Sequence, residues 1–356
     1  MSENFEDSQI DSQSQPNNQS NTREAESEKE IIEKDFVPHF LPTYRISSKF
    51  YALPIIFVVI IAGILSYLTA IFQLETGVQI DGGYLSEDEF GALGGIINGV
   101  IFTIMAAGSA FLIIYLVKKR GIDVLKYIFG LSFGFLSFFL SLFFSSTILY
   151  LIAIQFPESP SLVHTYNAFT NILLPIYVGI FTLFLLYGYF TSKSIGIKNI
   201  IVLYMGLLVG ASMGVLMPLW TTLAILIGIS LWDIFAVLYK KGPIKEMIDI
   251  ASQENNKNTG SKKDFQEKIE SGEAVYDTSK LEIGIGDLAF YSMLTSSALI
   301  QANSIIVMIL TAIAIIIGTG ITIMGLKRNK ILPGLPISIF LGIGTMLISW
   351  YIISII

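Results

Sequence analysis

The chain has 356 residues, of which 53% are apolar and only 14% charged, with a mean hydropathy of +0.67. This composition excludes an ordinary soluble domain and predicts an all-α polytopic membrane protein, whose main solvent is lipid. The net charge of −6 comes mainly from acids in the first 35 residues, and no basic patch suggests a nucleic-acid partner. Because cysteine is absent, the chain has no disulfide, thiolate nucleophile or sulfur-ligated metal.

Residues 1–46 are rich in Ser, Asn, Gln and Glu. They have too little apolar surface to offset the entropy of ordering the chain, so we expect a disordered cytoplasmic tail. An apolar core near the start of the chain is missing, and we therefore expect no secretory signal ahead of the first span.

Runs of about 20 apolar residues, enough to cross a hydrocarbon core of about 30 Å, recur along the rest of the chain. They predict nine transmembrane helices, six within 47–239 and three within 281–356. Gly214 and Pro218 offer the break that the long apolar stretch 199–239 requires. The predicted spans lie near 51–73, 93–117, 127–154, 168–191, 199–217, 219–239, 281–300, 304–326 and 334–356.

The connections that carry Lys and Arg alternate with connections that carry none. All 22 basic residues lie in the segment before the first span or in 118–126, 192–198, 240–280 and 327–330. Because basic connections stay on the cytoplasmic side during insertion, we expect a cell-membrane protein with a cytoplasmic N-terminus and an extracellular C-terminus.

The cytoplasmic connection 240–280 contains a helical pattern near its start. Ile244, Met247, Ile248 and Ala251 recur at helical spacing and predict a short amphipathic helix. A surface helix at the lipid interface and a gate over a site in the membrane both fit this pattern.

Two acids remain well inside predicted spans, Asp233 in the sixth and Asp287 in the seventh. An ionised Asp near a span centre costs roughly 2.5–3.5 kcal/mol on insertion scales. Each acid is seven residues from a flanking lysine, Lys240 or Lys280, which puts both about 10 Å from the cytoplasmic boundary. Because consecutive spans run antiparallel, the two carboxyls can face each other and share a proton.

Such a pair has three interpretations. In an aspartic protease, the ionised carboxyl takes a proton from a bound water while the protonated one donates to the scissile carbonyl oxygen. In a transporter or cation leak channel, the pair would relay protons or cations. A protonated Asp can also act as a structural hydrogen bond between helices. The depth of the two acids leaves all three open.

Glycines and prolines surround the two acids. Gly284 and Gly286 stand just before Asp287, and each weakens a helix by roughly 1 kcal/mol relative to Ala. They allow either close helix packing or the approach of a substrate backbone. At the entry to the last span, Pro333 and Pro336 donate no backbone hydrogen bond. This pattern fits both an ordinary helix start and a non-helical segment that lines a site.

Together these segments resemble the presenilin and signal peptide peptidase family of intramembrane aspartyl proteases. The signatures of that family are Tyr-Asp in the sixth span, Gly-x-Gly-Asp in the seventh and Pro-Ala-Leu in the ninth. The stretches 232–255 and 332–342 look closer to presenilins, and the resemblance implies a presenilin-like fold in an archaeal homologue. Two positions depart from the pattern, because Trp232 replaces Tyr and Gly334 replaces Ala.

The resemblance implies an aspartic endopeptidase that cuts transmembrane segments of membrane proteins, with Asp233 and Asp287 as the catalytic pair. It implies no cofactor, and its partners are transmembrane substrates and the bilayer. Accessory subunits are not evident in the sequence. The residues expected to bind the opened substrate strand are Trp232, Gly284, Ile285, Gly286, Pro333, Gly334 and Leu335.

Other intramembrane chemistries find less support. The two histidines, His39 and His164, lie outside the predicted span cores. Neither a His-Glu-x-x-His zinc site nor a Ser-His pair is therefore expected. We also expect no bound metal. Prepilin peptidases also use Gly-x-Gly-Asp, but are not expected to carry this Pro-Gly-Leu-Pro entry to a ninth span. A transporter stays the alternative, although no convincing internal repeat supports it.

Overall fold

The structure is a computed structural model that describes residues 30–32, 42–78, 82–121, 124–239, 274–276, 280–327 and 333–355. The amphipathic helix expected at residues 244–251 and most of the expected tail lie outside these ranges. The chain divides into a small unit, residues 1–34 with 261–277, and a large unit, 35–260 with 278–356. In the small unit, strand β1 (Glu30–Ile32) pairs in parallel with strand β3 (Ala274–Tyr276).

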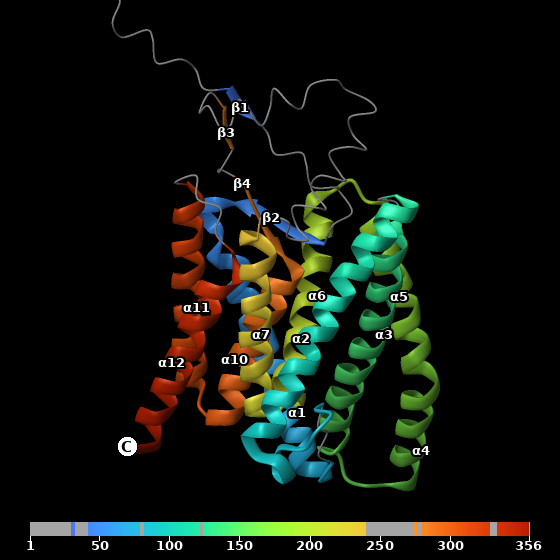
Figure 1. The fold of residues 1–356 in the computed structure, drawn as a ribbon. Coiled ribbons are helices and arrows are strands. Elements are labelled where there is room, and N and C mark those ends of the chain that lie inside the picture. Colours follow the sequence, from blue (N-terminus) through green and yellow to red (C-terminus); the bar gives the residue numbers. More distant parts are fainter. Residues whose placement is uncertain are drawn as a thin grey trace, which may run out of the picture. The chain divides into compact units, whose positions relative to one another are not determined.

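The large unit is a bundle of nine helices, counted over its described residues and with α4 and α5 taken as one rod (Figure 1). A short 3₁₀ turn (Ser48–Phe50) leads into the first helix, and a π-helical turn (Phe169–Leu173) joins α4 to α5. The helices are α1 (Ala52–Thr76), α2 (Glu87–Arg120), α3 (Val124–Ala153), α4 (Pro160–Ala168), α5 (Leu174–Thr191), α6 (Ile195–Leu216), α7 (Leu219–Leu238), α10 (Ile285–Ala302), α11 (Ile305–Lys327) and α12 (Leu335–Ile355).

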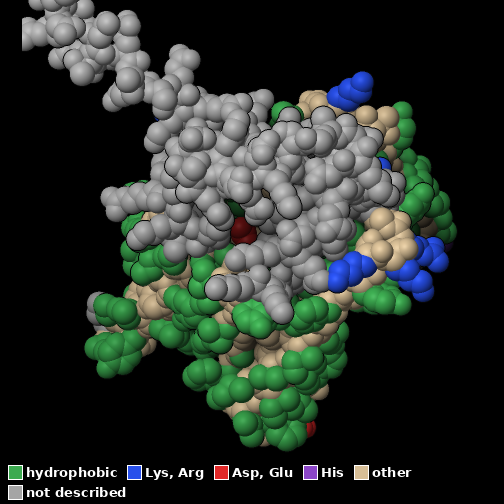
Figure 2. Space-filling model, turned by 45° about the horizontal axis from the view of Figure 1, so that its top comes forward, with side chains coloured by type: hydrophobic (Ala, Val, Ile, Leu, Met, Phe, Trp, Pro, Cys, Tyr) green, Lys and Arg blue, Asp and Glu red, His purple; other side chains and the backbone are tan. Residues whose placement is uncertain are grey.

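Eight of these rods are long and apolar enough to cross a membrane, and α10 is the exception. It can be less apolar because its surroundings are protein: every residue from Tyr291 to Ala298 is buried, and α10 packs against α1, α6, α7, α11 and α12. Apolar side chains cover much of the described surface on the face seen in Figure 2, as a surface in contact with lipid requires. The predicted all-α membrane bundle is therefore confirmed.

Helix α10 makes its closest contact with α6 through glycines. Gly206, Gly210 and Gly214 recur every four residues and form one stripe along α6. A Cβ atom at Gly210 would overlap the Cβ of Ser292, and one at Gly214 would lie 2.5 Å from the Cβ of Ser296. Small residues at this spacing let two helix backbones approach closely, which is the main source of helix association in a membrane.

Two short strands correct the boundaries expected from the sequence. Strand β2 (Thr43–Ser47), at the end of the expected tail, pairs antiparallel with β4 (Lys280–Gly284), at the start of the expected seventh span. The helix of that span therefore begins at Ile285. The physical reason is that Gly284 is a poor helix residue and Leu281 and Ile283 alternate with polar neighbours, as in a strand.

The fourth rod begins earlier than the expected residue 168. Pro160 occupies its first turn, and the side chain of Ser159 accepts a hydrogen bond from the backbone N–H of Leu162. Proline and serine in these positions start a helix efficiently. By contrast, the predicted break near Pro218 is confirmed, because α6 ends at Leu216 and α7 begins at Leu219.

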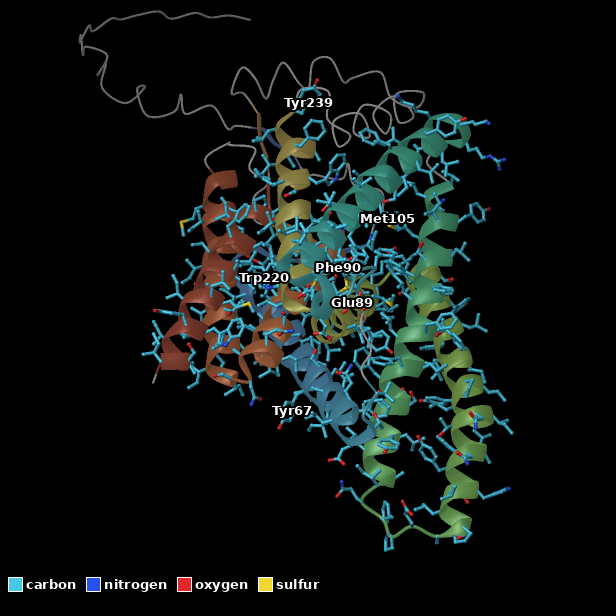
Figure 3. The ribbon with its side chains drawn as sticks, turned by 60° about the horizontal axis from the view of Figure 1, so that its bottom comes forward. Tyr67, Glu89, Phe90, Met105, Trp220 and Tyr239 are labelled. Carbon is cyan, nitrogen blue, oxygen red and sulfur yellow. The ribbon has the colours of Figure 1, made fainter. Side chains whose placement is uncertain are left out.

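The first turn of α2 lies beside the start of α7, where Figure 3 places Glu89 and Phe90 near Trp220. The carboxylate of Glu87 accepts hydrogen bonds from the backbone N–H groups of Trp220 (3.2 Å) and Thr221 (2.6 Å) and from the Thr221 hydroxyl (2.7 Å). Gly91, in α2, has a φ of 57°, which glycine adopts readily and which offsets this turn from the rest of the helix. Glu87 therefore caps α7 from a neighbouring helix.

Replacing Glu87 with alanine should lower the free energy of unfolding by about 1–2 kcal/mol, because the first N–H groups of α7 lose their acceptor. Thermal unfolding of the purified protein measures the change. Glu89→Ala removes an exposed acid from the same turn and is the matched control, which should unfold like the wild type. Equal effects of the two substitutions would contradict the capping role.

Candidate functional site

Asp233 lies near the end of α7 that Tyr239 marks in Figure 3, and its side chain is half-buried. Its Oδ2 atom accepts a hydrogen bond of 3.3 Å from the backbone N–H of Leu335, the first residue of α12. The N–H groups of a first helical turn have no partner within their own helix, so they are free to bind an acceptor of this kind. Asp233 thereby joins the sixth span to the start of the ninth.

Asp287 lies in the first turn of α10 rather than deep within a helix. Its Oδ2 atom lies close to two of the motif glycines: a Cβ atom would be 3.7 Å away if placed on Gly334 and 4.0 Å away if placed on Gly284. The Asp233 carboxyl reaches the same segment, because it accepts the N–H of Leu335, the residue after Gly334. The three motif segments predicted from the sequence therefore converge at one place.

The position of Asp287 lowers the cost of placing an acid there. The N-terminal end of a helix carries a partial positive charge, which offsets part of the cost of burying a carboxyl in the first turn. Glycine at position 334 is not a steric requirement, because 3.7 Å is an ordinary van der Waals contact. Alanine, the residue that the resemblance implies there, would therefore fit beside the carboxyl.

The other predicted substrate-binding residues are distributed around this centre. Gly286 and Ile285 are half-buried, and the backbone N–H of Ile285 donates to the carbonyl oxygen of Pro42 (3.1 Å). Pro333 and Leu335 are buried. The ring contacts of Trp232 lead elsewhere, to Phe111 of α2 (5.7 Å between ring centroids) and to Phe235 of its own helix (5.5 Å). Trp232 thus packs on the α2 side of α7.

A buried cluster of hydroxyl groups lies one helical turn beyond the acids, and sequence analysis missed it. Tyr291, four residues after Asp287, donates to the Ser338 hydroxyl (3.3 Å). Thr319 of α11 bonds to both, at 3.4 Å to Tyr291 and 3.0 Å to Ser338. The cluster ties α10, α11 and α12 together directly behind the acids. Its only signal in the sequence is the helical spacing of Tyr291 from Asp287 and of Ser338 from Gly334.

The chemistry of the site is that of two carboxyls. Within the described parts of the chain, no group of three or more His, Asp or Glu residues could hold a metal ion. A carboxyl that accepts a backbone N–H and a neighbouring carboxyl beside small residues can together take up and donate protons. Two glycines, Gly284 and Gly334, lie beside the Asp287 carboxyl.

Comparisons with known proteins show which family the sequence matches. A family model described as presenilin matches residues 53–259 and 252–356. Presenilin-B of Dictyostelium discoideum is 38% identical over 133 residues, which cover 36% of this chain but only 25% of that protein. A presenilin-like protein of Arabidopsis thaliana is 25% identical over 325 residues, covering 72% of this chain and 78% of that one. The archaeal origin expected from the sequence stays a prediction.

Among solved structures, one described as a presenilin family intramembrane aspartate protease is similar in fold. The alignment has a TM-score of 0.53 at 13% sequence identity, and it covers 85% of this chain and 99% of the other. At this identity the likeness concerns the fold alone.

Proposed function

Because the chain belongs to the presenilin family, we propose that it is an intramembrane aspartyl protease that hydrolyses peptide bonds within transmembrane segments of membrane proteins. The observation that carries this proposal is the convergence of Asp233 and Asp287 on the Gly334–Leu335 segment. Two acids brought together inside a membrane bundle carry an energetic cost that a purely structural contact does not require.

In the proposed mechanism the two carboxyls have different roles. The N–H of Leu335 stabilises the charged form of Asp233, so we assign Asp233 as the base that takes a proton from the attacking water. Asp287, protonated, donates its proton to the scissile carbonyl oxygen as the water oxygen bonds to the carbonyl carbon. When the C–N bond breaks, Asp233 passes the proton it took from water to the departing amine. Asp287 takes a proton back from a hydroxyl group of the intermediate as the carbonyl re-forms, so the pair again holds one proton, on Asp287.

The proposed substrate is a transmembrane helix that has been opened locally, because a helical amide is already hydrogen-bonded within its own segment. Strand β4 leads directly into the motif, and among the described residues its only ladder partner is β2. An extended substrate can pair with the second edge of β4, as peptides do with an exposed sheet edge. The opened strand would then lie in a groove lined by two segments, Gly284 to Gly286 and Pro333 to Leu335. Trp232 would lie on the side of this groove that faces α2.

We further propose that the N-terminus is cytoplasmic and the C-terminus extracellular. The last turn of α2 contains three basic residues, Lys118, Lys119 and Arg120. In Figure 2, where the top of Figure 1 comes forward, Lys and Arg side chains gather near that end of the bundle. Basic residues favour the cytoplasmic side. On this orientation Asp233 and Asp287 lie nearer the cytoplasm, from which water would enter.

The test is to place the purified protein in liposomes with a single-span substrate, and to measure peptide products and ion flux in the same preparation. We expect products cut within the span, identified by mass spectrometry, and none from the double variant Asp233→Ala/Asp287→Ala. Flux of protons or cations that depends on both aspartates, without peptide products, would instead establish the transporter or leak channel.

A further inference from the structure

The strand ahead of the first helix holds the segment that carries Asp287. Strand β4 ends at Gly284, which is also the residue that caps α10, so no loop separates the strand from the Gly284–Asp287 motif. The position of Asp287 therefore follows the register of β4. A slip of one residue would move the chain by about 3.3 Å and turn every side chain to the opposite face.

The register of β4 is specified on both faces of the small sheet. Tyr44 and Ile283 face each other across the two strands and are buried, at 9% and 5% exposure. On the other face, Arg45 and Glu282 are directly opposite, with 3.0 Å between Nε and Oε1. The Thr43 hydroxyl adds a hydrogen bond of 3.4 Å to Glu282. Opposite charges paired directly across two strands stabilise one register over its neighbours.

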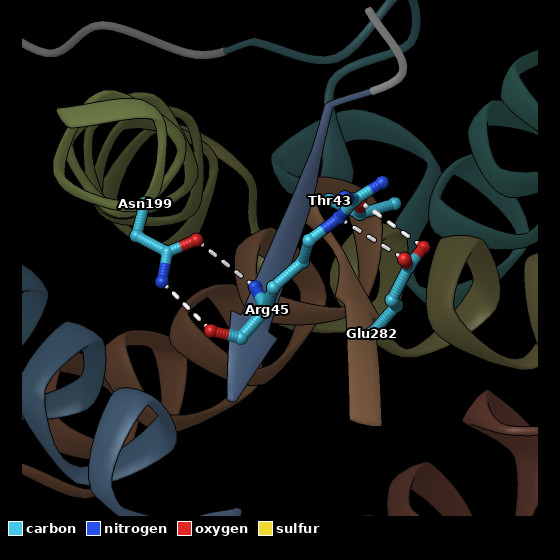
Figure 4. A network of polar contacts seen from close by, with 4 residues as sticks. All are labelled: Thr43, Arg45, Asn199 and Glu282. Atoms are coloured by element: carbon cyan, nitrogen blue, oxygen red, sulfur yellow. Dashed lines mark hydrogen bonds and ion pairs between the residues drawn. The ribbon is translucent and has the colours of Figure 1, made fainter. Parts of the chain in front are cut away.

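Strand β2 is itself fixed from its other edge by α6 (Figure 4). The side-chain amide of Asn199 accepts from the backbone N–H of Arg45 (2.9 Å) and donates to its carbonyl oxygen (2.8 Å). One amide thus satisfies both backbone groups of a single residue, as a neighbouring strand would. Since α6 also packs on α10 through Gly210 and Gly214, the contacts form a closed frame from α6 through β2 and β4 to α10.

We propose that Arg45, Glu282 and Asn199 are positioning residues that lock the register of β4 and, through it, the place of the Asp287 carboxyl. The inference rests on the proposed protease function for its effect on catalysis, but the frame itself can be tested without activity. If the frame loosens, Asp287 occupies several positions relative to Asp233, and a substrate strand paired with β4 is presented in several registers. A misplacement of about 1 Å can lower a rate by roughly a hundredfold.

The first test is hydrogen–deuterium exchange in full-length Asn199→Asp and Arg45→Met. Asn199→Asp keeps the acceptor and the shape of the side chain but loses the donor to the Arg45 carbonyl. Arg45→Met removes the charge opposite Glu282. We expect faster exchange at residues 280–287 in both variants, with the buried part of α10 still protected.

Arg120→Met, which removes an exposed guanidinium from the end of α2, is the control. Wild-type protection at 280–287 in both variants overturns the proposal, whether or not the protein is a protease.

The second test is cleavage of a single-span substrate by the same variants. We expect kcat to fall roughly tenfold to a hundredfold with KM nearly unchanged, and mass spectrometry to show additional cut positions. The charge-inverted double variant Arg45→Glu/Glu282→Arg should recover the single wild-type cut position, which a merely destabilised protein would not do. Loosened exchange with unchanged kcat and cut position would refute the positioning role, whereas an inactive wild type would refute the proposed function.

Discussion

Replacing Asp287 with asparagine is expected to lower the rate of peptide cleavage by at least about 10³-fold, and Asp233→Asn should do the same. An amide neither accepts nor donates the proton that each step requires. Both variants should fold, because asparagine keeps the shape of the side chain and can still accept the N–H of Leu335 at position 233. Initial rates with a purified single-span substrate measure the effect.

Thermal unfolding of the same variants separates catalysis from stability. Removing an ionisable group from a half-buried site relieves the cost of its charged form, so the melting temperature should stay at the wild-type value or rise. Glu75→Gln, which neutralises an exposed acid near the end of α1, is the control and should keep full activity. Wild-type rates in either asparagine variant, with the fold intact, would remove that carboxyl from the mechanism.

Gly210→Ala should destabilise the protein by about 2 kcal/mol, and Gly210→Leu should prevent native packing of α6 on α10. The added Cβ atom would overlap that of Ser292 and would lie 2.6 Å from the carbonyl oxygen of Ala289, a backbone atom that cannot move aside on its own. Because α10 carries Asp287, cleavage should be lost along with stability. Unfolding in mixed micelles at increasing denaturing detergent measures the change.

A second substitution and a control sharpen this result. Ser292→Gly removes the opposing Cβ atom, so the double variant Gly210→Ala/Ser292→Gly should recover part of the lost stability. Gly108, inside α2, has no atom within 4 Å of an added Cβ, and Gly108→Ala should be neutral or stabilising by up to about 1 kcal/mol. If Gly210→Ala unfolds like Gly108→Ala, the close α6–α10 contact is not a source of stability.

The parts of the molecule that the sequence predicts well are those that lipid alone determines. The helical runs follow from the length of apolar segments, and the break at Pro218 follows from its missing N–H. The convergence of Asp233 and Asp287 could be anticipated because a carboxyl in a span needs a use, and because each lies at the same distance from a flanking lysine. Each of these predictions uses only the composition of a segment and its position in the membrane.

What could not be predicted depends on partners far apart in the chain. Arg45 and Asn199 are separated by 154 residues, and the segment before α1 has the polar composition of a tail. Its alternation of Tyr44 and Ile46 with polar residues is a weak strand signal, decisive only once β4 lies beside it. The capping role of Glu87 could not be predicted for the same reason. In the sequence it is one of several acids in a polar connection, and its acceptor role appears only when the start of α7 lies next to it.

The burial of α10 has a consequence for biogenesis. A helix of 18 residues that carries several hydroxyl groups and an acid gains little from partitioning into lipid on its own. Its residence in the membrane has to come from protein partners, chiefly the glycine face of α6, which is synthesised earlier. The chain thus adds α10, and with it Asp287, only after its first six spans have been made, when the glycine face of α6 is already available for packing.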